Sequence, residues 1–210
     1  MKKLVSMILV VVMLCSLTAC DLGGASMEQL CGKWEMTVYQ DADTAETVLT
    51  NLDFYPEEIA LVDMESLACV MIVEFNEDKT YRYYFDIDAT KEAVRTFFET
   101  VMDDLYTGRE TLSASYQQDM SGMTRDGFNQ FYVDLFGAES YDALIDSFVE
   151  SSFDYTVLSQ PLEEGTFRIR LKDIYKTPDG KTEEESMGFS IDGDTLTLTY
   201  LDGDEVYTKR

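Results

Sequence analysis

The sequence contains no histidine, and cationic residues are scarce: 16 Lys and Arg stand against 41 Asp and Glu, for a formal net charge of −25. Without histidine the chain can form neither a Ser-His-Asp triad nor a His-ligated metal site. A strongly acidic chain is also unsuited to nucleic acid, because phosphate binding needs a cationic surface. These absences exclude two broad classes of function before any motif is considered.

Catalytic motifs are missing too. The chain has no GxSxG, SxxK, GxGxxG, Walker or HExxH pattern. Its carboxylates are so numerous that pairs at glycosidase-like separations arise by chance and carry no information. The Asp-Gly-Asp segments at 192–194 and 202–204 lack the later ligands of an EF-hand loop, which favours hairpin turns over calcium sites. We therefore predict a protein that is not an enzyme and has no catalytic residue, cofactor or metal.

The N-terminus has the layout of an export signal. Residues 1–19 place Lys2 and Lys3 before an apolar run, Leu4–Leu17, which is too short to span a membrane comfortably. The run ends in Leu-Thr-Ala followed by Cys20, which resembles a bacterial lipobox. The resemblance implies that residues 1–19 are a lipoprotein signal peptide and that Cys20 receives a diacylglycerol. The alternative is an ordinary secreted protein with a cysteine at the cleavage site.

The predicted anchor sets where the protein works. Residues 20–28 are expected to hold the lipidated cysteine and a short tether, so the next domain lies close to the membrane. Two or three acyl chains would make this attachment stable. We expect the protein at the cell membrane, on its extracytoplasmic face, with the membrane as a partner through the diacylglycerol anchor. Anionic lipid repels an acidic domain, which favours a domain facing outward into solvent.

Two cysteines, Cys31 and Cys69, remain in the predicted mature domain. Each lies at the edge of a predicted strand, and an exported protein is in a compartment that permits disulfides. A bridge between them is therefore one possibility, and two buried thiols are the other. No CxxC is present, so the sequence gives no support to a redox centre or a zinc knuckle.

Alternating residues predict strands in the first part of the domain. Residues 32–39 put Trp34, Met36 and Val38 on one face, as in a half-buried strand. Residues 68–75 are almost all apolar and rich in β-forming types, and 80–86 return after a polar turn. These two segments predict a hairpin.

The middle of the chain predicts helices. Residues 44–52 could form a short helix, and Pro56 could begin another. Three longer amphipathic helices follow, with N-caps expected at Asp88, Thr124 and Ser140 and with stops at Gly108 and Gly137. We predict one domain over residues 29–210, with a helical insertion at about 88–152.

From residue 153 onward the pattern returns to strands. Three Asp-Gly pairs, at 179–180, 192–193 and 202–203, separate segments in which apolar and polar residues alternate. Closely spaced Asp-Gly turns of this kind favour an antiparallel meander. The predicted fold is thus mainly β with a helical insertion, an α+β arrangement in which an antiparallel sheet closes as a barrel or stays an open meander.

Two segments resemble lipocalin-like proteins. Gly32-Lys33-Trp34 is similar to the Gly-x-Trp opening of a lipocalin barrel, and residues 189–198 are similar to its closing hairpin. Uncharacterised lipoproteins of Gram-positive bacteria show a similar plan with a helical insert, so a Gram-positive cell is favoured. The resemblance implies that a late cation, Lys209 or Arg210, packs over Trp34. It also implies a barrel that binds a small ligand.

Two further groups of residues have alternative interpretations. Arg168, Arg170 and Lys172 share a strand face and either pair with acids across the sheet or bind an anion. Aromatic side chains either form core or line an apolar pocket between barrel and helices; they are Tyr81, Tyr83, Tyr84, Phe85, Phe97, Phe98, Phe128, Phe131, Tyr132, Phe136 and Phe148.

These observations lead to one functional prediction and one alternative. We predict a non-catalytic, lipid-anchored lipocalin-like module that binds a small apolar ligand inside its barrel. A barrel interior filled by side chains such as Trp34, Phe167 and Leu198 would contradict that location. The alternative is an envelope protein without a ligand, which docks a protein partner through its amphipathic helices and needs an exposed apolar patch on them.

Overall fold

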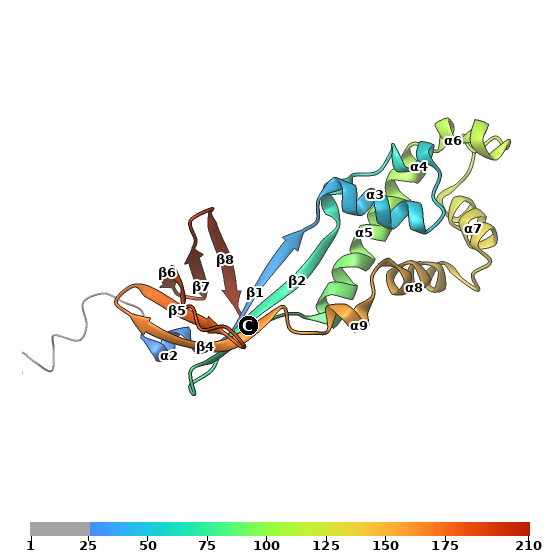
Figure 1. Ribbon diagram of the computed structural model, residues 1–210. Coiled ribbons are helices and arrows are strands. Elements are labelled where there is room, and N and C mark those ends of the chain that lie inside the picture. The colour runs from blue at the N-terminus through green and yellow to red at the C-terminus, as the bar shows by residue number, and fades with distance from the viewer. Residues whose placement is uncertain (1–25) are drawn as a thin grey trace, which may run out of the picture.

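The computed structural model describes residues 26–210, which form two lobes, a β-barrel and a helical lobe (Figure 1). Cys20, the predicted signal peptide and most of the predicted tether lie outside the described residues.

Eight antiparallel strands close the barrel. Each strand pairs with the next in sequence, and the last returns to the first, where Trp34 lies opposite Lys209. The structure confirms the predicted antiparallel barrel and the hairpin near residues 68–86. The strands are β1 (Gly32–Tyr39), β2 (Ala68–Phe75), β3 (Thr80–Phe85), β4 (Glu163–Arg170), β5 (Asp173–Pro178), β6 (Glu185–Asp192), β7 (Thr195–Thr199) and β8 (Asp204–Lys209).

Alternation of side chains explains how the sheet closes on a core. In β7, Leu196 and Leu198 are buried, whereas the threonines at both of its ends are exposed. The turn between β6 and β7 contains Gly193 with φ of 59°, a left-handed conformation that glycine adopts without strain. Thus the Asp-Gly pair predicted to turn here does so, and the alternation fixes which face of the strand points inward.

The two ends of the barrel differ. One end carries helix α2 (Met27–Leu30) and the β2–β3, β4–β5 and β6–β7 turns; we call it the closed end. The opposite end carries the β5–β6 and β7–β8 turns and the connections to the helical lobe; we call it the mouth. The helical lobe therefore lies on the side of the mouth, away from α2 (Figure 1).

Trp34 seals the closed end. Its ring is fully buried, and its Nε1–H donates a hydrogen bond to the carbonyl oxygen of Leu30 at 2.7 Å. The Nζ of Lys209 lies 5.1 Å from the ring centroid, the cation over the tryptophan that the resemblance implied. Arg210 instead forms ion pairs with Glu35 and Asp86.

The helical lobe contains more helices than expected and comes from two insertions. Residues 40–67 between β1 and β2 supply α3 (Ala42–Asn51), α4 (Pro56–Ile59) and the 3₁₀ helix η1 (Met64–Ser66). Residues 86–162 supply α5 (Ile87–Thr107), α6 (Arg109–Tyr116), α7 (Arg125–Phe136), α8 (Tyr141–Ser152) and α9 (Tyr155–Leu158). The short helices considered for 44–52 and from Pro56 are present as α3 and α4, whereas the predicted insertion at about 88–152, with three helices, was too small, because residues 86–162 hold five.

Capping accounts for most of the helix boundaries. The hydroxyls of Thr124 and Ser140 accept from the backbone N–H groups of Gly127 and Ala143, which confirms both predicted N-caps. The first long helix begins two residues earlier than expected, because Asp86, not Asp88, is its N-cap and accepts from the N–H of Ala89 at 3.0 Å.

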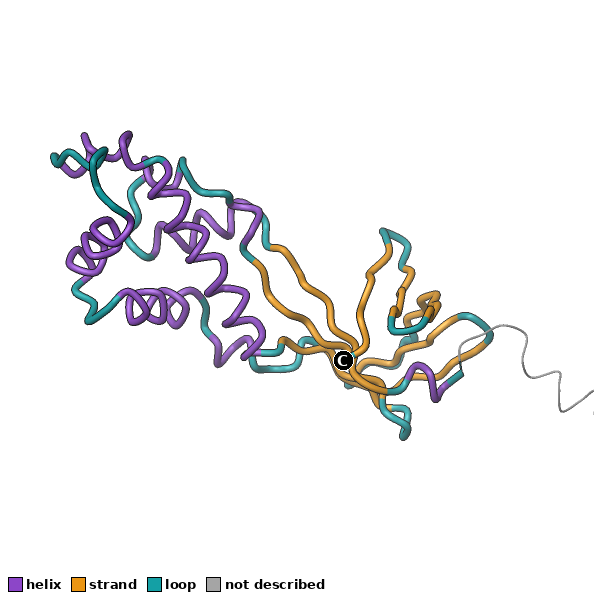
Figure 2. Tube along the Cα trace, turned by 180° about the vertical axis from the view of Figure 1, so that it is seen from behind, coloured by secondary structure: helices purple, strands orange, loops and turns teal. Residues whose placement is uncertain are grey.

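Helix packing and hydrogen bonds join the two lobes. Helix α5 packs along β2, where the backbone N–H of Val70 donates to Thr90 Oγ1 at 3.0 Å and Thr90 is fully buried. Figure 2 shows the paired β1 and β2 strands reaching from the barrel to the helices. At the other end of the long insertion, the N–H of Leu162 donates to the carbonyl of Tyr83 at 2.8 Å, so the chain leaves and re-enters the barrel at neighbouring points.

Candidate functional site

A pocket of about 520 Å³ lies at the mouth of the barrel. Its volume is within the range of small-molecule sites. Strands β2–β5 and β8, the residue before β4 and the turn after β7 supply its lining, which mixes apolar, aromatic and charged groups: Met71, Tyr83, Leu162, Glu163, Lys176, Tyr200, Asp202, Gly203, Asp204 and Glu205. This is the candidate functional site.

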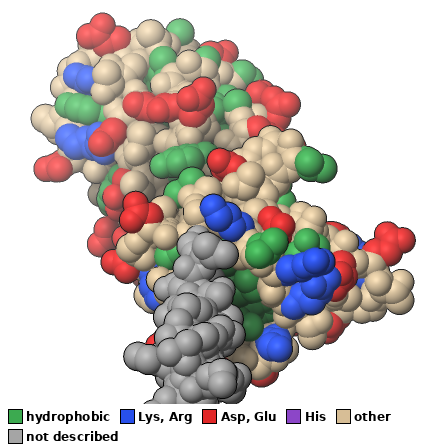
Figure 3. All heavy atoms as spheres, turned by 90° about the vertical axis from the view of Figure 1, so that its left-hand side faces the viewer, with side chains coloured by type: hydrophobic (Ala, Val, Ile, Leu, Met, Phe, Trp, Pro, Cys, Tyr) green, Lys and Arg blue, Asp and Glu red, His purple; other side chains and the backbone are tan. Residues whose placement is uncertain are grey.

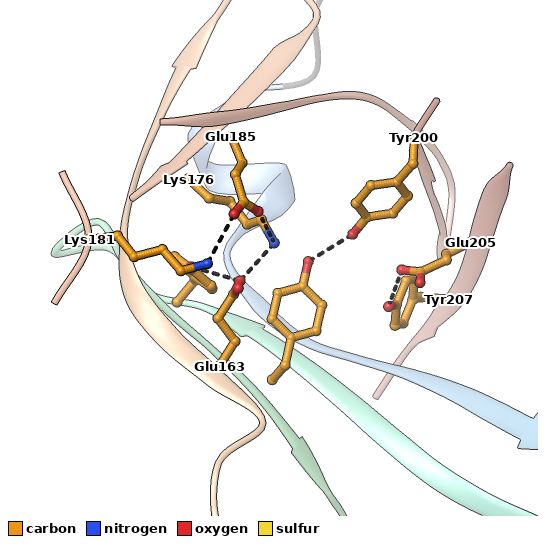
Figure 4. Close-up of polar contacts among 9 residues, drawn as sticks. Glu163, Lys176, Lys181, Glu185, Tyr200, Glu205 and Tyr207 are labelled. Atoms are coloured by element: carbon orange, nitrogen blue, oxygen red, sulfur yellow. Dashed lines mark hydrogen bonds and ion pairs between the residues drawn. The ribbon is translucent and has the colours of Figure 1, made fainter. Parts of the chain in front are cut away.

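Lys176 projects into the barrel from β5. The strand alternates, so Lys176 falls on the same inward face as Ile174, and only 6% of it is exposed. Its Nζ donates to Glu163 Oε1 at 2.7 Å and lies 3.9 Å from Glu185 Oε2 (Figure 4). The same ammonium lies 4.9 Å from the ring centroid of Tyr83, so charge and ring face both hold it in place.

Glu163 lies at the centre of a hydrogen-bonded group. Burial by itself would raise the pKa of Glu163, but hydrogen bonds donated by Lys176 and by the hydroxyl of Tyr81 outweigh burial and lower it. The carboxylate is therefore ionised at neutral pH, and both of its donors are fixed by strands of the barrel wall.

Tyrosine hydroxyls lie in the pocket and beside it. Those of Tyr83 and Tyr200 lie 3.2 Å apart, and the hydroxyl of Tyr207 donates to Glu205 Oε2 at 2.7 Å (Figure 4). Burial raises the pKa of Tyr200 to about 12, and it raises the pKa values of Tyr83 and Tyr207 further. These hydroxyls stay protonated wherever the fold persists.

The buried tyrosines predict alkaline unfolding. In the unfolded chain a tyrosine ionises near pH 10, whereas Tyr83 and Tyr207 resist ionisation in the fold. Their contribution to stability is complete below pH 10 and is lost as the pH rises above it. We expect each to lower the free energy of unfolding by about 1.4 kcal/mol per pH unit above pH 10. Urea unfolding from pH 8 to 11, with tyrosinate absorbance, measures this.

A control uses Tyr207→Phe, which removes one of these hydroxyls and should make the slope above pH 10 shallower. Ionisation of all the tyrosines near pH 10 with no loss of stability would contradict the prediction.

The barrel interior below the pocket is filled. Trp34, Phe167 and Leu198 are all buried in one cluster with the inward side chains of the other strands. The predicted ligand cavity inside the barrel is therefore not present in this part of the structure, because large side chains occupy it. The open space lies at the mouth instead.

Nine of the eleven aromatic residues proposed to line one pocket belong to two separate cores, and Tyr84 and Phe85 belong to neither. Tyr81 and Tyr83 pack inside the barrel, whereas Phe97, Phe98 and Phe148 pack in the core of the helical lobe. They act mainly as core, and only Tyr83 of the predicted group lines the mouth pocket.

Cys31 and Cys69 are free thiols at opposite ends of β1. Cys31 precedes Gly32, at the closed end, whereas Cys69 pairs in register with Val38 at the other end of the strand. Seven residues of extended strand separate these positions by about 20 Å, far beyond disulfide reach. The bridge considered from the sequence does not form in this fold. Burial raises the pKa of the Cys69 thiol to about 11.

The three cations predicted to share a strand face differ in their ion pairing. Arg168 pairs through two hydrogen bonds, at 2.8 and 2.6 Å, with Glu184, which lies in the connection between β5 and β6. Arg170 and Lys172 have no ion pair within residues 26–210.

A second buried polar cluster lies in the helical lobe. The side chain of Glu58 in α4 is buried, and its Oε1 accepts hydrogen bonds from the hydroxyls of Tyr116 and Tyr132. Its Oε2 accepts from the N–H of Tyr55 at 2.8 Å. Both oxygens of this carboxylate accept hydrogen bonds from groups within the lobe, so the cluster joins α4, α6 and α7.

Residues 26–210 contain no cluster of three or more His, Cys, Asp or Glu side chains placed to hold a metal ion. None of the helices in this part of the chain has the length and apolar composition of a membrane span. The chain matches no protein-family model, no curated protein and no solved structure.

Proposed function

We propose that the protein is an extracytoplasmic, lipid-anchored binding module with a lipocalin-like barrel. Three features support the barrel type: consecutive strands that close as β1 to β8, a Gly-x-Trp opening on β1, and a cation over Trp34. The signal layout that ends at Cys20 supports the anchor. Attachment near α2, at the closed end, would leave the mouth facing away from the membrane.

We propose that the mouth binds a small molecule with a positively charged group on an apolar or aromatic body. The observation that carries this proposal is the composition of the lining, in which four carboxylates stand against one lysine. Lys176 is already paired with Glu163, whereas Asp202 and Asp204 are exposed at the rim. Tyrosine rings beside carboxylates suit an organic cation, and Met71 and Leu162 suit its apolar part.

The alternative, docking of a protein partner through the helices, has less support. The predicted apolar faces of α5 and α8 are buried in the core of the helical lobe, together with most of the face of α7. Leu135 of α7 and Val157 of α9 are exposed, at 47% and 66%, but single apolar side chains on separate helices are not a docking patch.

The charge of the rim predicts which ligands bind. We expect benzyltrimethylammonium to bind more tightly than benzyl alcohol, and benzoate not to bind, because the lining attracts cations. Replacing Asp202 and Asp204 with asparagine should weaken cation binding about five-fold, at about 0.5 kcal/mol for each exposed charge. Titration calorimetry at low salt measures the affinities, and added salt should reduce them.

The matched control is the other Asp-Gly-Asp turn. Asn substitutions at Asp192 and Asp194 remove the same charge from the closed end and should leave the affinity unchanged. Equal losses in both variants, or tight binding of benzoate, would contradict the proposed ligand class.

A further inference from the structure

The tip of the β4–β5 hairpin has unusual chemistry for a tight turn. Leu171 is 82% exposed and has φ of 60°, a conformation that glycine adopts far more readily than leucine. The side chain therefore gains no packing in the fold while its backbone is strained. An exposed, strained leucine in a turn of this kind suggests a role outside the fold.

Cations flank this leucine. Arg170 and Lys172 are exposed on either side of it, and neither forms an ion pair within residues 26–210. The same hairpin shows that pairing is available nearby, because Arg168 binds Glu184. An apolar residue between two free cations is the composition that a bilayer surface with anionic headgroups attracts, since the leucine can enter the interface while the cations meet phosphates.

The position of the hairpin agrees with this chemistry. Its tip and α2 lie at the same end of the barrel, opposite the helical lobe (Figures 1 and 2). Only residues 21–25 separate Cys20 from the described chain, so an anchor at Cys20 would hold this end within about 20 Å of the bilayer.

The negative charge of the molecule is concentrated in the helical lobe, away from this end of the barrel. Residues 40–67 and 86–162, which form the helical lobe, hold 23 Asp and Glu against 4 Lys and Arg. In contrast, Lys and Arg side chains gather with hydrophobic ones on the barrel end seen in Figure 3. Acids are present there too, at Glu28 in α2, at Asp173 opposite Arg170 and in the β2–β3 and β6–β7 turns, but a surface of anionic lipid repels the helical lobe far more strongly.

We propose that Leu171, with Arg170 and Lys172, is a membrane-contact site that inserts into the headgroup region of an anionic bilayer. The proposal rests on the lipid anchor at Cys20, which brings the hairpin to the surface. The contact would hold the barrel upright, with its mouth toward solvent.

The test uses the full-length lipoprotein in vesicles of phosphatidylglycerol with brominated acyl chains, which quench tryptophan on contact. Leu171→Trp reports on the tip, and Leu201→Trp, in an exposed turn at the mouth, is the matched control. The native Trp34 is fully buried and supplies a constant background. We expect emission from position 171 to be quenched and emission from position 201 to be retained.

A second variant tests the charges. Gln substitutions at Arg170 and Lys172, made in the Leu171→Trp protein, should lower the ratio of inserted to free tip about five-fold for each cation removed. Equal quenching in phosphatidylcholine vesicles would overturn the role given to the cations.

The outcomes separate this proposal from the anchor itself. A protein that floats with the vesicles but shows no quenching at position 171 keeps the anchor and overturns the contact site. A protein that does not float with the vesicles overturns both.

Discussion

Replacing Trp34 with alanine is expected to lower the free energy of unfolding by about 3–5 kcal/mol. The side chain is fully buried at the closed end, donates its Nε1–H to Leu30, and packs under Lys209. Alanine would leave a large cavity, an unpaired carbonyl and a cation without its ring. Because Trp34 pairs with Lys209 in the register that joins β1 to β8, the loss also weakens closure of the barrel. Urea unfolding followed by far-ultraviolet circular dichroism measures the change.

Tyr39→Ala is the matched control, because Tyr39 is an aromatic residue on the same strand but is 67% exposed. This substitution should change the free energy of unfolding by no more than about 0.5 kcal/mol. Trp34→Phe should fall between the two, since it keeps most of the ring but loses the hydrogen bond. Similar losses for Trp34→Ala and Tyr39→Ala would show that Trp34 does not seal the barrel.

Glu58→Ala is expected to destabilise the protein by about 4 kcal/mol, because hydrogen bonds to a buried carboxylate contribute about 1.5–3 kcal/mol each. The change removes the acceptor shared by the hydroxyls of Tyr116, which is half-buried, and Tyr132, which is fully buried, and leaves both without that partner. The N–H of Tyr55 loses its acceptor as well. The helical lobe should lose its order first, which hydrogen exchange of α6 and α7 would detect.

Two variants show whether the hydrogen bonds cause this loss. Glu58→Gln keeps one oxygen for the tyrosine hydroxyls and should be milder than Glu58→Ala. Glu57→Ala alters the neighbouring, exposed carboxylate and should have little effect. The explanation fails if Glu58→Ala is no more destabilising than Glu57→Ala.

Period-2 alternation and turn chemistry made the barrel predictable from the sequence. The Asp-Gly pairs mark turns, and the alternating leucines and threonines of β7 define an inside and an outside without reference to any other strand. These local features predicted the strands that became β6, β7 and β8 as a meander, but residues 173–178 were not predicted as a separate strand and the β4–β5 turn at 171–172 was missed. Barrel closure through Trp34 and Lys209 was expected only by resemblance.

The helical lobe was harder to predict because its pattern is divided between two insertions. Pro56 indicated where α4 begins, but the helix has only four residues and its one fully buried side chain is a glutamate, so no hydrophobic pattern indicated how it packs. Helix α6 buries only Leu112, so residues 109–116 looked like a polar connection. In both cases contacts from distant segments stabilise helices that are weak on their own.

The mouth pocket was missed for a different reason. Lys176 follows Ile174 on the inward face of β5, but residues 173–178 were not predicted as a strand, so this interior lysine was not recognised. Its partner Glu163 begins β4 after the long insertion, and no sequence pattern relates the two positions. Charged pairs inside a barrel depend on register between strands, and register across an insertion is a tertiary property.

The order of the strands along the chain also constrains how the protein is made. β1 emerges first and can complete its pairing only when β8, the last strand, has been synthesised. Until then both outer strands of the growing sheet are unpaired, and such edges favour association between chains. The helices of residues 86–162 emerge before β4, so their folding brings the two sides of the β3–β4 junction together and shortens the loop that must close. We therefore expect early folding of the helical lobe to favour pairing of β3 with β4.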